Sequence, residues 1–282
     1  MPKVAIITDS TVNLPQSLLD AYSIAVLPQT VIWENESFRD GIDIKPKEFY
    51  SRLKTCKNIP TTSQVTPTAF EQLFSAYIEK GQPVLAILVS SELSGTFQSA
   101  IQAKNSLPGS AIELIDSRSA SLALGFHVIM AARAAANGAS LKECKAIAEK
   151  AMAQSGVFFV VDTLEFLYRG GRIGGGARFL GTALNLKPIL ELKDGRIEAI
   201  ERVRTQNKAF ARLLDLVSQR VKGHSPLRLG ILDADARVQA QQLVEQAQTL
   251  FHPDEIIQSD VSPVIGAHTG PGTVGIAYLT DM

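Results

Sequence analysis

Short apolar runs alternate with longer helical patterns over the first half of this chain, and this rhythm constrains its fold more than any other feature. Four runs of strand length are bounded by Pro, Gly, Ser or Asp: Val4–Ile7, Ala25–Val31, Val84–Val89 and Ile112–Ile115. Three segments between them have the length and apolar recurrence of helices: Pro67–Glu79, Gly95–Lys104 and Ser119–Ala136. Such alternation is typical of a mostly parallel sheet with helices on its faces. We therefore predict an N-terminal α/β domain.

The pattern changes from about residue 157, where a strand over Val157–Val161 is followed by a glycine-rich turn. Asp194-Gly195 lies between two further apolar runs and is a strong signal for a β-hairpin. Helical patterns follow near 206–222 and 237–251. We predict two domains, an α/β domain over residues 1–156 and an α+β domain over residues 157–282. The last strand, Val274–Leu279, can return to the cleft between them.

Charge and composition exclude several classes of protein. The chain has 282 residues, of which 28 are Lys or Arg and 28 are Asp or Glu, so no overall field attracts nucleic acid. Its apolar runs fall far short of the roughly 20 residues that span a membrane. Cys56 and Cys144 lack metal-ligand spacing, which predicts reduced thiols and no metal site. Because the N-terminus enters a strand pattern at once and lacks the features of a signal peptide, we expect a cytoplasmic protein.

Three loops rich in hydroxyl groups flank the predicted strands and helices: Asp9–Asn13, Pro60–Gln64 and Ser90–Thr96. Ligands of open α/β sheets bind at loops of this kind, outside the carboxyl ends of the strands. In the third loop Gly95 permits close backbone approach, and Ser94 and Thr96 offer hydroxyl donors beside a helix N-terminus. This combination favours an anion such as a carboxylate. Since Ser, Thr, Asp and Asn also cap helices, each loop keeps a purely structural interpretation.

His268 stands among glycines and a proline in Gly266–Gly272, which predicts a rigid loop. In it His268 can donate a hydrogen bond to a ligand carboxylate, or it can bond nearby backbone. Ser94 with His268 as its base is a second possibility, although the surroundings of Ser94 lack the G-x-S-x-G elbow of a hydrolase. The remaining histidines are assigned to packing or to the surface: His127, His224 and His252.

The segment Tyr168–Arg178 is rich in Arg and Gly but matches neither the dinucleotide-binding nor the P-loop pattern. We therefore predict no P-loop site for ATP. A single Arg-Gly-Gly element in a neutral chain also argues against RNA binding. Five arginines form either a basic patch or the scattered cations of a solvated surface: Arg169, Arg172, Arg178, Arg202 and Arg204.

A series of motifs in this chain resembles the DegV family, the acyl-binding subunit of bacterial fatty acid kinase. In order along the chain they are Thr8-Asp-Ser10, Pro60-Thr-Thr-Ser-Gln64, Ser90-Ser-x-Leu-Ser-Gly-Thr96, Asp116-Ser117, Asp162-x-Leu-x-x-Leu-x-Arg-Gly-Gly-Arg-Ile173, Lys187-Pro-Ile-Leu190 and Gly266-Ala-His-Thr-Gly-Pro-Gly272. They run from the first predicted strand to the last, and together they are specific.

This resemblance implies a two-domain protein with one long-chain fatty acid, such as palmitate, in a buried tunnel between the domains. The carboxylate-binding hydroxyls of the family correspond to Thr62 and Ser94, and its terminal histidine corresponds to His268. We add Ser63, Gly95 and Thr96 to this carboxylate site. An ATP-dependent partner kinase would convert the bound carboxylate to an acyl phosphate for phospholipid synthesis. The chain itself would be a non-catalytic carrier without a cofactor and without stable membrane insertion.

Further expectations follow from this interpretation. We expect Arg169, Arg172 and Arg202 to dock the partner kinase, because their motifs look too exposed to line a tail pocket. Tail-lining residues are expected from Phe126–Ala132 and from Val157–Val161. The alternative functions are a serine-based acyl hydrolase or transferase, and a dihydroxyacetone-kinase-like subunit that binds a small molecule. Trp33 and Gly174–Gly176 depart from the family pattern, at the expected tunnel mouth and in a neighbouring loop.

Overall fold

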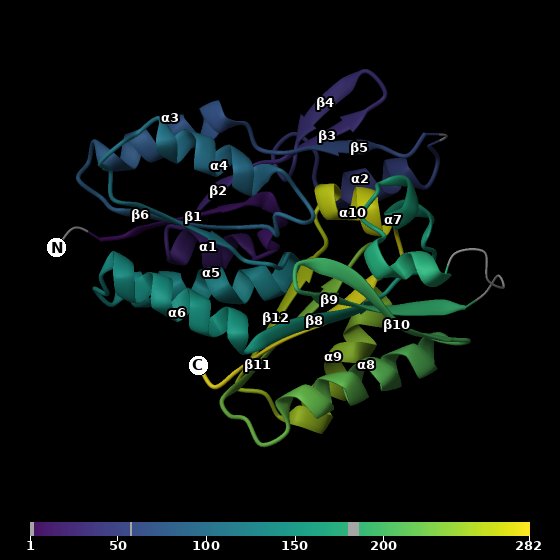
Figure 1. The fold of residues 1–282 in the computed structure, drawn as a ribbon. Helices are drawn as coiled ribbons and strands as arrows, with labels where there is room; N and C mark the ends of the chain where they lie inside the picture. Colours follow the sequence, from purple (N-terminus) through teal and green to yellow (C-terminus); the bar gives the residue numbers. More distant parts are fainter. Residues whose placement is uncertain (1–2, 57, 180–185) are drawn as a thin grey trace.

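A parallel four-stranded sheet with helices on both faces forms the first part of the structure, a computed structural model that describes residues 3–56, 58–179 and 186–282 (Figure 1). Its strands follow the order β2 (Ala25–Leu27), β1 (Ala5–Asp9), β6 (Val84–Leu88) and β7 (Ile112–Asp116). Helices α3 (Pro67–Ile78) and α4 (Thr96–Asn105) cover one face, and α5 (Ser121–Ala136) and α6 (Leu141–Ala153) cover the other.

A six-stranded mixed sheet forms the second part. Its order is β10 (Arg196–Val203), β9 (Lys187–Lys193), β8 (Ser155–Val160), β13 (Val274–Thr280), β11 (Leu227–Asp233) and β12 (Glu255–Asp260). All neighbours are antiparallel except β11 and β12. Helices α8 (Gln206–Val221) and α9 (Arg237–Phe251) pack on the outer face of this sheet, and α5 packs on its inner face (Figure 1). The last strand, β13, therefore lies in the middle of the second sheet.

Helix α5 joins the two parts because it contacts strands of both sheets. Its sequence is apolar all round, and thirteen of its residues are buried, as expected for a helix with protein on every side. Its one fully charged side chain, Arg133, is neutralised by a bidentate pair with Glu255 at 2.7 and 2.9 Å. Gly125 allows close packing, since a Cβ there would lie 3.0 Å from the Val12 carbonyl oxygen.

A small antiparallel sheet and several short helices close the region between the two parts. The sheet has the order β4 (Glu36–Arg39), β3 (Thr30–Trp33) and β5 (Thr61–Ser63). The helices are η1 (Ser10–Val12), α1 (Gln16–Ala21), α2 (Pro46–Leu53), α7 (Glu165–Arg169), η2 (Gly174–Phe179) and α10 (Pro263–Thr269). Helix α10 contacts α7, α2, β3, β5 and η1, so it sits where these elements meet (Figure 1).

The predicted fold class is confirmed: a parallel sheet flanked by helices is joined to a second, sheet-rich part. The predicted hairpin is also present between β9 and β10, with Asp194 and Gly195 both at positive φ, as a type I′ turn requires. The three predicted helices agree with α3, α4 and α5 to within two residues at each end. Among the described residues, none of the helices is long and apolar enough to cross a membrane.

One predicted strand, Ala25–Val31, is wrong because it is two strands in different sheets. Pro28 interrupts it after β2, which pairs with β1, and β3 then pairs with β4 and β5. Proline lacks the N–H that a continuous ladder would need, so the chain changes sheets at this point. Trp33, at the end of β3, is fully buried against Phe49, so it belongs to the core.

Candidate functional site

A cavity of about 230 Å³ lies between the first sheet, the small sheet and the inner face of the second sheet. One buried water needs only about 10–15 Å³ by this kind of measure, so the cavity has room for a much larger molecule. Five of the six residues predicted for the carboxylate site line it: Thr62, Ser63, Ser94, Gly95 and His268. They come from β5, from the loop after β6 and from α10, which the fold brings together.

Thr62 and His268 form the first polar pair of the cavity. The Thr62 Oγ1 and His268 Nε2 atoms are 2.8 Å apart, although the two residues are 206 positions apart in sequence. The other ring nitrogen, Nδ1, is buried and has no hydrogen-bond partner among the described residues. It lies against Gly170, where a Cβ would come within 2.1 Å of it. The pair can therefore share one ligand oxygen, with the tautomer set by the ligand.

His268 is a neutral donor or acceptor at physiological pH, because burial and the nearby Arg172 guanidinium lower its pKa to about 4. The neutral imidazole can donate one hydrogen bond to a ligand carboxylate, but it supplies no positive charge in the ligand-free protein. The predicted rigid loop is wrong, since His268 lies in the last turn of α10. Pro263 at the first helical turn and Gly270 with φ 75° after the last are the start and stop signals of that helix.

Ser94, Gly95 and Thr96 form the second polar group, at the N-terminus of α4. Ser94 Oγ is 2.9 Å from Thr96 Oγ1 and accepts a hydrogen bond from the Thr96 N–H at 3.3 Å. Thr96 is fully buried and does not line the cavity, so it supports Ser94 from behind. A Cβ at Gly95 would lie 2.0 Å from Oε1 of the exposed Gln64 side chain, which would have to move to make room. The polar group at the N-terminus of α4 is thus compatible with a structural role and with the binding of an anion.

Asp9 holds this polar group in position from the core. Its fully buried carboxylate accepts hydrogen bonds from the Val89 N–H at 2.8 Å, the Thr11 hydroxyl at 2.7 Å and the Gln29 amide at 3.2 Å. Burial raises the pKa of Asp9, and these bonds act in the opposite direction. Ser94 in turn lies 3.5 Å from Gln29 Oε1. Thr11 and Gln29 also line the cavity, and no motif around Gln29 distinguishes it in the sequence.

Arg172 is half-buried and lines the cavity, so the expectation that its motif is too exposed to line a tail pocket is wrong for this residue. Its guanidinium donates to the Leu93 carbonyl at 3.0 Å and to the Gly170 carbonyl at 2.7 Å. Among the lining residues that the structure describes, it carries the only formal charge at neutral pH. The charge that a buried anion requires is therefore available from Arg172, at the side of the neutral His268.

The two other arginines predicted for docking lie elsewhere. Arg169 ends α7, is exposed, and forms an i,i+4 ion pair with Glu165 at 2.7 Å. Arg202 is half-buried in β10, opposite Pro188 of β9. Neither lines the cavity, so Arg172 is the only one of the three that does.

Aliphatic and aromatic side chains make up the rest of the lining. The predicted contribution of Val157–Val161 is found in part, since Val157 and Phe159 of β8 line the cavity. The predicted contribution of Phe126–Ala132 is wrong, because these residues of α5 pack between the two sheets and only the start of α5 reaches the cavity. The remaining apolar lining residues are Val89, Leu93, Ala120, Leu167, Leu192, Ile197, Leu232, Val261, Val264 and Ile265.

Comparison with known proteins agrees with this architecture. The model of the DegV family, described as uncharacterised proteins, matches residues 3–281. The chain belongs to the DegV family. A DegV domain-containing protein of Caldanaerobacter subterraneus subsp. tengcongensis is 34% identical over 278 residues, with 99% of each chain covered.

Two solved structures of the DegV family share the fold over nearly the whole chain. A DegV family protein from Thermus thermophilus, described by its fatty acid binding, has a TM-score of 0.94 and 36% identity, covering 99% of this chain and 100% of its own. DegV of Bacillus subtilis, described as a fatty acid binding protein, has a TM-score of 0.90 and 30% identity, with 100% of each chain covered. Both of these DegV family proteins are thus fatty acid binding proteins.

Proposed function

We propose that this protein binds one long-chain fatty acid in the cavity. The carboxylate lies beside Thr62, Ser94 and His268, with Ser63 and Gly95 at its edge, and the acyl chain extends along β8, β9 and β10. The observation that carries this proposal is the division of the lining into a polar part and an otherwise apolar wall. The polar part consists of hydroxyl groups, the side-chain amides of Gln29 and Gln64, one imidazole and one guanidinium. A monoanion with a long apolar tail fits such a lining better than a small polar molecule does.

Burial of the tail supplies most of the binding energy. Each buried methylene contributes roughly 0.8 kcal/mol, so about fourteen of them contribute on the order of 11 kcal/mol. Ordering the flexible chain and the loss of translational freedom remove part of this. The surplus still allows tight binding.

The carboxylate opposes burial unless it is compensated, because an unpaired anion in an apolar cavity is costly. Thr62 and Ser94 offer hydroxyl donors, and the neutral His268 offers one N–H. Arg172 supplies the positive charge, since its guanidinium already lies in the lining. Charge-assisted hydrogen bonds of this kind are roughly twice as strong as neutral ones.

We further propose that the carboxylate is presented to an ATP-dependent partner kinase that forms the acyl phosphate. The resemblance to the acyl-binding subunit of fatty acid kinase supports this step, and so does the position of Ser63 and Gln64, which line the cavity and are exposed. Arg169 and Arg202 remain candidates for docking the kinase. Arg172 is reassigned from docking to the cavity.

Extraction of the purified protein with organic solvent, followed by mass spectrometry, tests the binding step. We expect about one fatty acid per chain. The delipidated protein should also bind a labelled palmitate, with the Thr62→Val and Ser94→Ala variants weaker. A protein that yields no fatty acid and binds no palmitate after delipidation would contradict the proposal.

Charge reversal at the surface tests the presentation step. Arg169→Glu and Arg202→Glu are expected to reduce acyl-phosphate formation by the kinase and to leave fatty acid retention unchanged. Lys208→Glu, on the exposed face of α8, is the matched control. Loss of lipid in the Arg169 or Arg202 variants, or unchanged acyl-phosphate formation, would remove these residues from the docking surface.

The geometry gives less support to a serine hydrolase. His268 contacts Thr62, and no hydrogen bond joins it to Ser94 among the described residues. An imidazole with a pKa of about 4 is also a weak general base. Turnover of an activated ester that disappears in Ser94→Ala would nevertheless establish that activity.

A further inference from the structure

A second cavity, of about 510 Å³, adjoins the first on the side of β8 and β9. Its lining is more polar than that of the first cavity. The polar and charged members are Ser117, Arg118, Ser119, His127, Ser155, Glu191, Lys193, Asp194, Arg220 and Tyr278. None of the polar residues of the first cavity lines the second, so the contact between the two cavities is on the apolar side of the first.

Three segments of the chain line both cavities. Val157 of β8 and Leu192 of β9 appear in both linings. The third segment leads into α5: its residues Ser117–Ser119 line the second cavity, and Ala120 and Ser121 line the first. Val157 and Leu192 are also direct partners in the antiparallel ladder, so their side chains stand side by side on one face of the sheet. This pair therefore forms a wall between the two cavities.

The far side of this wall is unsuited to an acyl tail. His127 is buried, its Nε2 lies 2.7 Å from Ser155 Oγ, and its Nδ1 has no partner in the part of the chain that the structure describes. A tail that entered this space would displace water from such polar groups without replacing their hydrogen bonds. The boundary between apolar and polar surroundings thus coincides with Val157 and Leu192.

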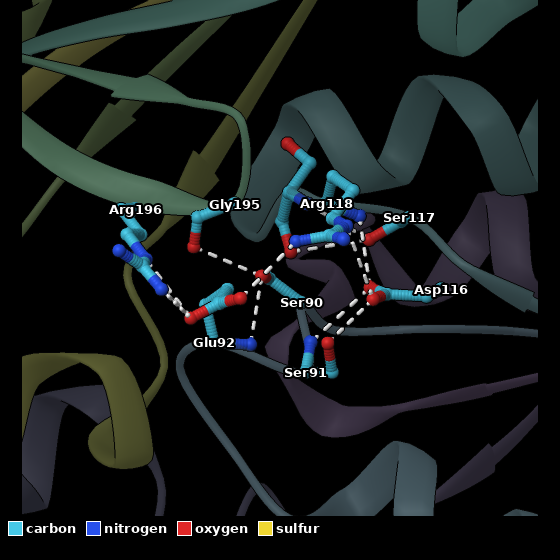
Figure 2. A network of polar contacts seen from close by, with 9 residues as sticks. Ser90, Ser91, Glu92, Asp116, Ser117, Arg118, Gly195 and Arg196 are labelled. Atoms are coloured by element: carbon cyan, nitrogen blue, oxygen red, sulfur yellow. Dashed lines mark hydrogen bonds and ion pairs between the residues drawn. The ribbon is translucent and has the colours of Figure 1, made fainter.

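A network of polar contacts holds the end of β9 in place (Figure 2). Ser90 Oγ donates to the Gly195 carbonyl at 2.9 Å, and Glu92 pairs with Arg196 at 2.7 Å and with Arg118 at 3.3 Å. These contacts join the hairpin between β9 and β10 to the loops after β6 and β7. Gly195 itself has no space for a side chain, since a Cβ would lie 2.5 Å from Ser90 Oγ. The hairpin, and with it Leu192, is therefore fixed relative to the first sheet.

We propose that Val157 and Leu192 are the specificity-determining residues that set the longest acyl chain this protein accepts. The inference rests on the proposed binding of a fatty acid and adds where the tail ends. A chain that fills the first cavity stops against the two side chains, and a longer one must push into the polar second cavity or leave its head group out of position.

The wall is tested by letting saturated fatty acids of 12 to 20 carbons, in steps of about two carbons, compete for the delipidated protein. Mass spectrometry then measures how much of each acid is bound. Leu192→Ala opens the wall. Because each buried methylene is worth about fourfold in affinity, the preference for an acid two carbons longer should rise by up to about sixteenfold. Val157→Ile thickens the wall by one methylene and should shift the preference toward shorter acids. The two variants are thus expected to move in opposite directions.

Leu190→Ala is the matched control. Leu190 is fully buried in the same strand, two residues from Leu192, and lines neither cavity. This variant should lose stability but keep the wild-type chain-length preference. Should Leu192→Ala fail to fold, the opposite shift in Val157→Ile still decides the question.

The outcomes separate the two proposals. A wild-type protein that binds none of the acids refutes the proposed function and the wall with it. Binding of fatty acids with the same chain-length preference in wild type, Leu192→Ala and Val157→Ile refutes the wall alone. A shift in Leu190→Ala as large as that in Leu192→Ala would also overturn it, because general loosening of the sheet would then explain the result.

Discussion

The polar end of the cavity and its apolar end are built from different parts of the molecule and by different contacts. The polar end gathers Thr62, Ser94, Arg172 and His268 from four separate segments, and hydrogen bonds fix each side chain. The apolar end includes one face of a continuous sheet, whose side chains are positioned by strand pairing: Val157, Phe159, Leu192, Ile197 and Leu232. Under the proposed function, the polar end recognises the carboxylate, whereas the apolar end limits the length of the acyl tail. Substitutions at the first should weaken all acyl chains alike, and substitutions at the second should change which chain is preferred.

Arg172→Met should have the largest effect, because it removes the only formal charge among the described lining residues and leaves a bound carboxylate uncompensated. Breaking a buried charge pair costs about 3 kcal/mol, which is a loss of about hundredfold in fatty acid affinity. Titration of delipidated protein with a labelled fatty acid measures it. Arg169→Met, at an exposed position with an ion pair to Glu165, is the control and should bind as wild type. A loss of affinity that differs with the length of the acyl chain would contradict the distinction between the polar and the apolar end.

Thr62→Val should have the next largest effect. The substitution keeps the size of the side chain and removes the hydroxyl that faces His268 Nε2 at 2.8 Å. A hydrogen bond to a charged group is worth about 1.5 kcal/mol or more, so affinity for each fatty acid should fall about tenfold. Thr62→Ser retains the hydroxyl and should restore most of the binding. If Thr62→Ser binds as weakly as Thr62→Val, the methyl group matters and the hydroxyl does not.

Gly95→Ala should have a moderate effect through Gln64. The new Cβ would displace the Gln64 side chain, which donates to Ser99 Oγ at 2.9 Å and lines the cavity. We expect affinity to fall about fivefold, in line with the loss of about one hydrogen bond. Gln64→Ala removes the obstruction, so the double variant should bind no more weakly than Gln64→Ala alone. If the losses of affinity in the two single variants instead add up in the double variant, Gly95 acts through its own backbone and not through Gln64.

The last expected effect is on stability instead of affinity, and it concerns the pH dependence of the lipid-free protein. His268 has a pKa of about 4 in the folded state, below the ~6.5 of a free imidazole. Between these values only the unfolded chain takes up the proton, so the free energy of unfolding falls as pH drops from 6.5 toward 4, by at most about 3 kcal/mol. His268→Asn should flatten that slope, as measured by denaturant unfolding at several pH values.

The pH dependence of the free energy of unfolding must be compared between His268→Asn and wild type, because another buried group changes this free energy with pH in the opposite direction. Burial raises the pKa of Asp40 to about 7, so its contribution to stability is lost as pH rises through that value. His252→Asn, at an exposed position with φ 46° that Asn tolerates, is the surface control. An unchanged slope in His268→Asn would contradict the neutral state assigned to this residue.

Much of the fold could be predicted because its signals are local. Asp194-Gly195 specifies its turn through two residues that adopt positive φ easily, and the alternation of apolar runs and helices identifies the parallel sheet. Apolar content alone does not place the run Ala25–Val31, because Pro28 divides it between two sheets. The helix that carries His268 is short and is followed by glycines, so its sequence resembles a loop despite the start signal at Pro263.

The polar end of the site could largely be predicted from sequence, and the apolar end could not. Ser94 and Thr62 are small hydroxyl residues at or beside helix starts and strand ends, where ligands of α/β sheets bind, so their positions carry information. Arg172 shows the limit of that reasoning. Its motif looks exposed, yet the turn after α7 directs its guanidinium to the Leu93 and Gly170 carbonyls and into the lining.

The sequence by itself determined that the chain alternates strands and helices, that its Asp194-Gly195 turn is a hairpin, and that hydroxyl groups gather around Ser94. Only the tertiary structure decided that Arg172 faces the cavity, that Phe126–Ala132 fill the core, and that Val157 and Leu192 separate two cavities. The reason is that turn chemistry and capping depend on neighbouring residues, whereas a cavity is the space that distant segments leave unfilled. An apolar side chain has the same local pattern whether it packs against another side chain or borders such a space.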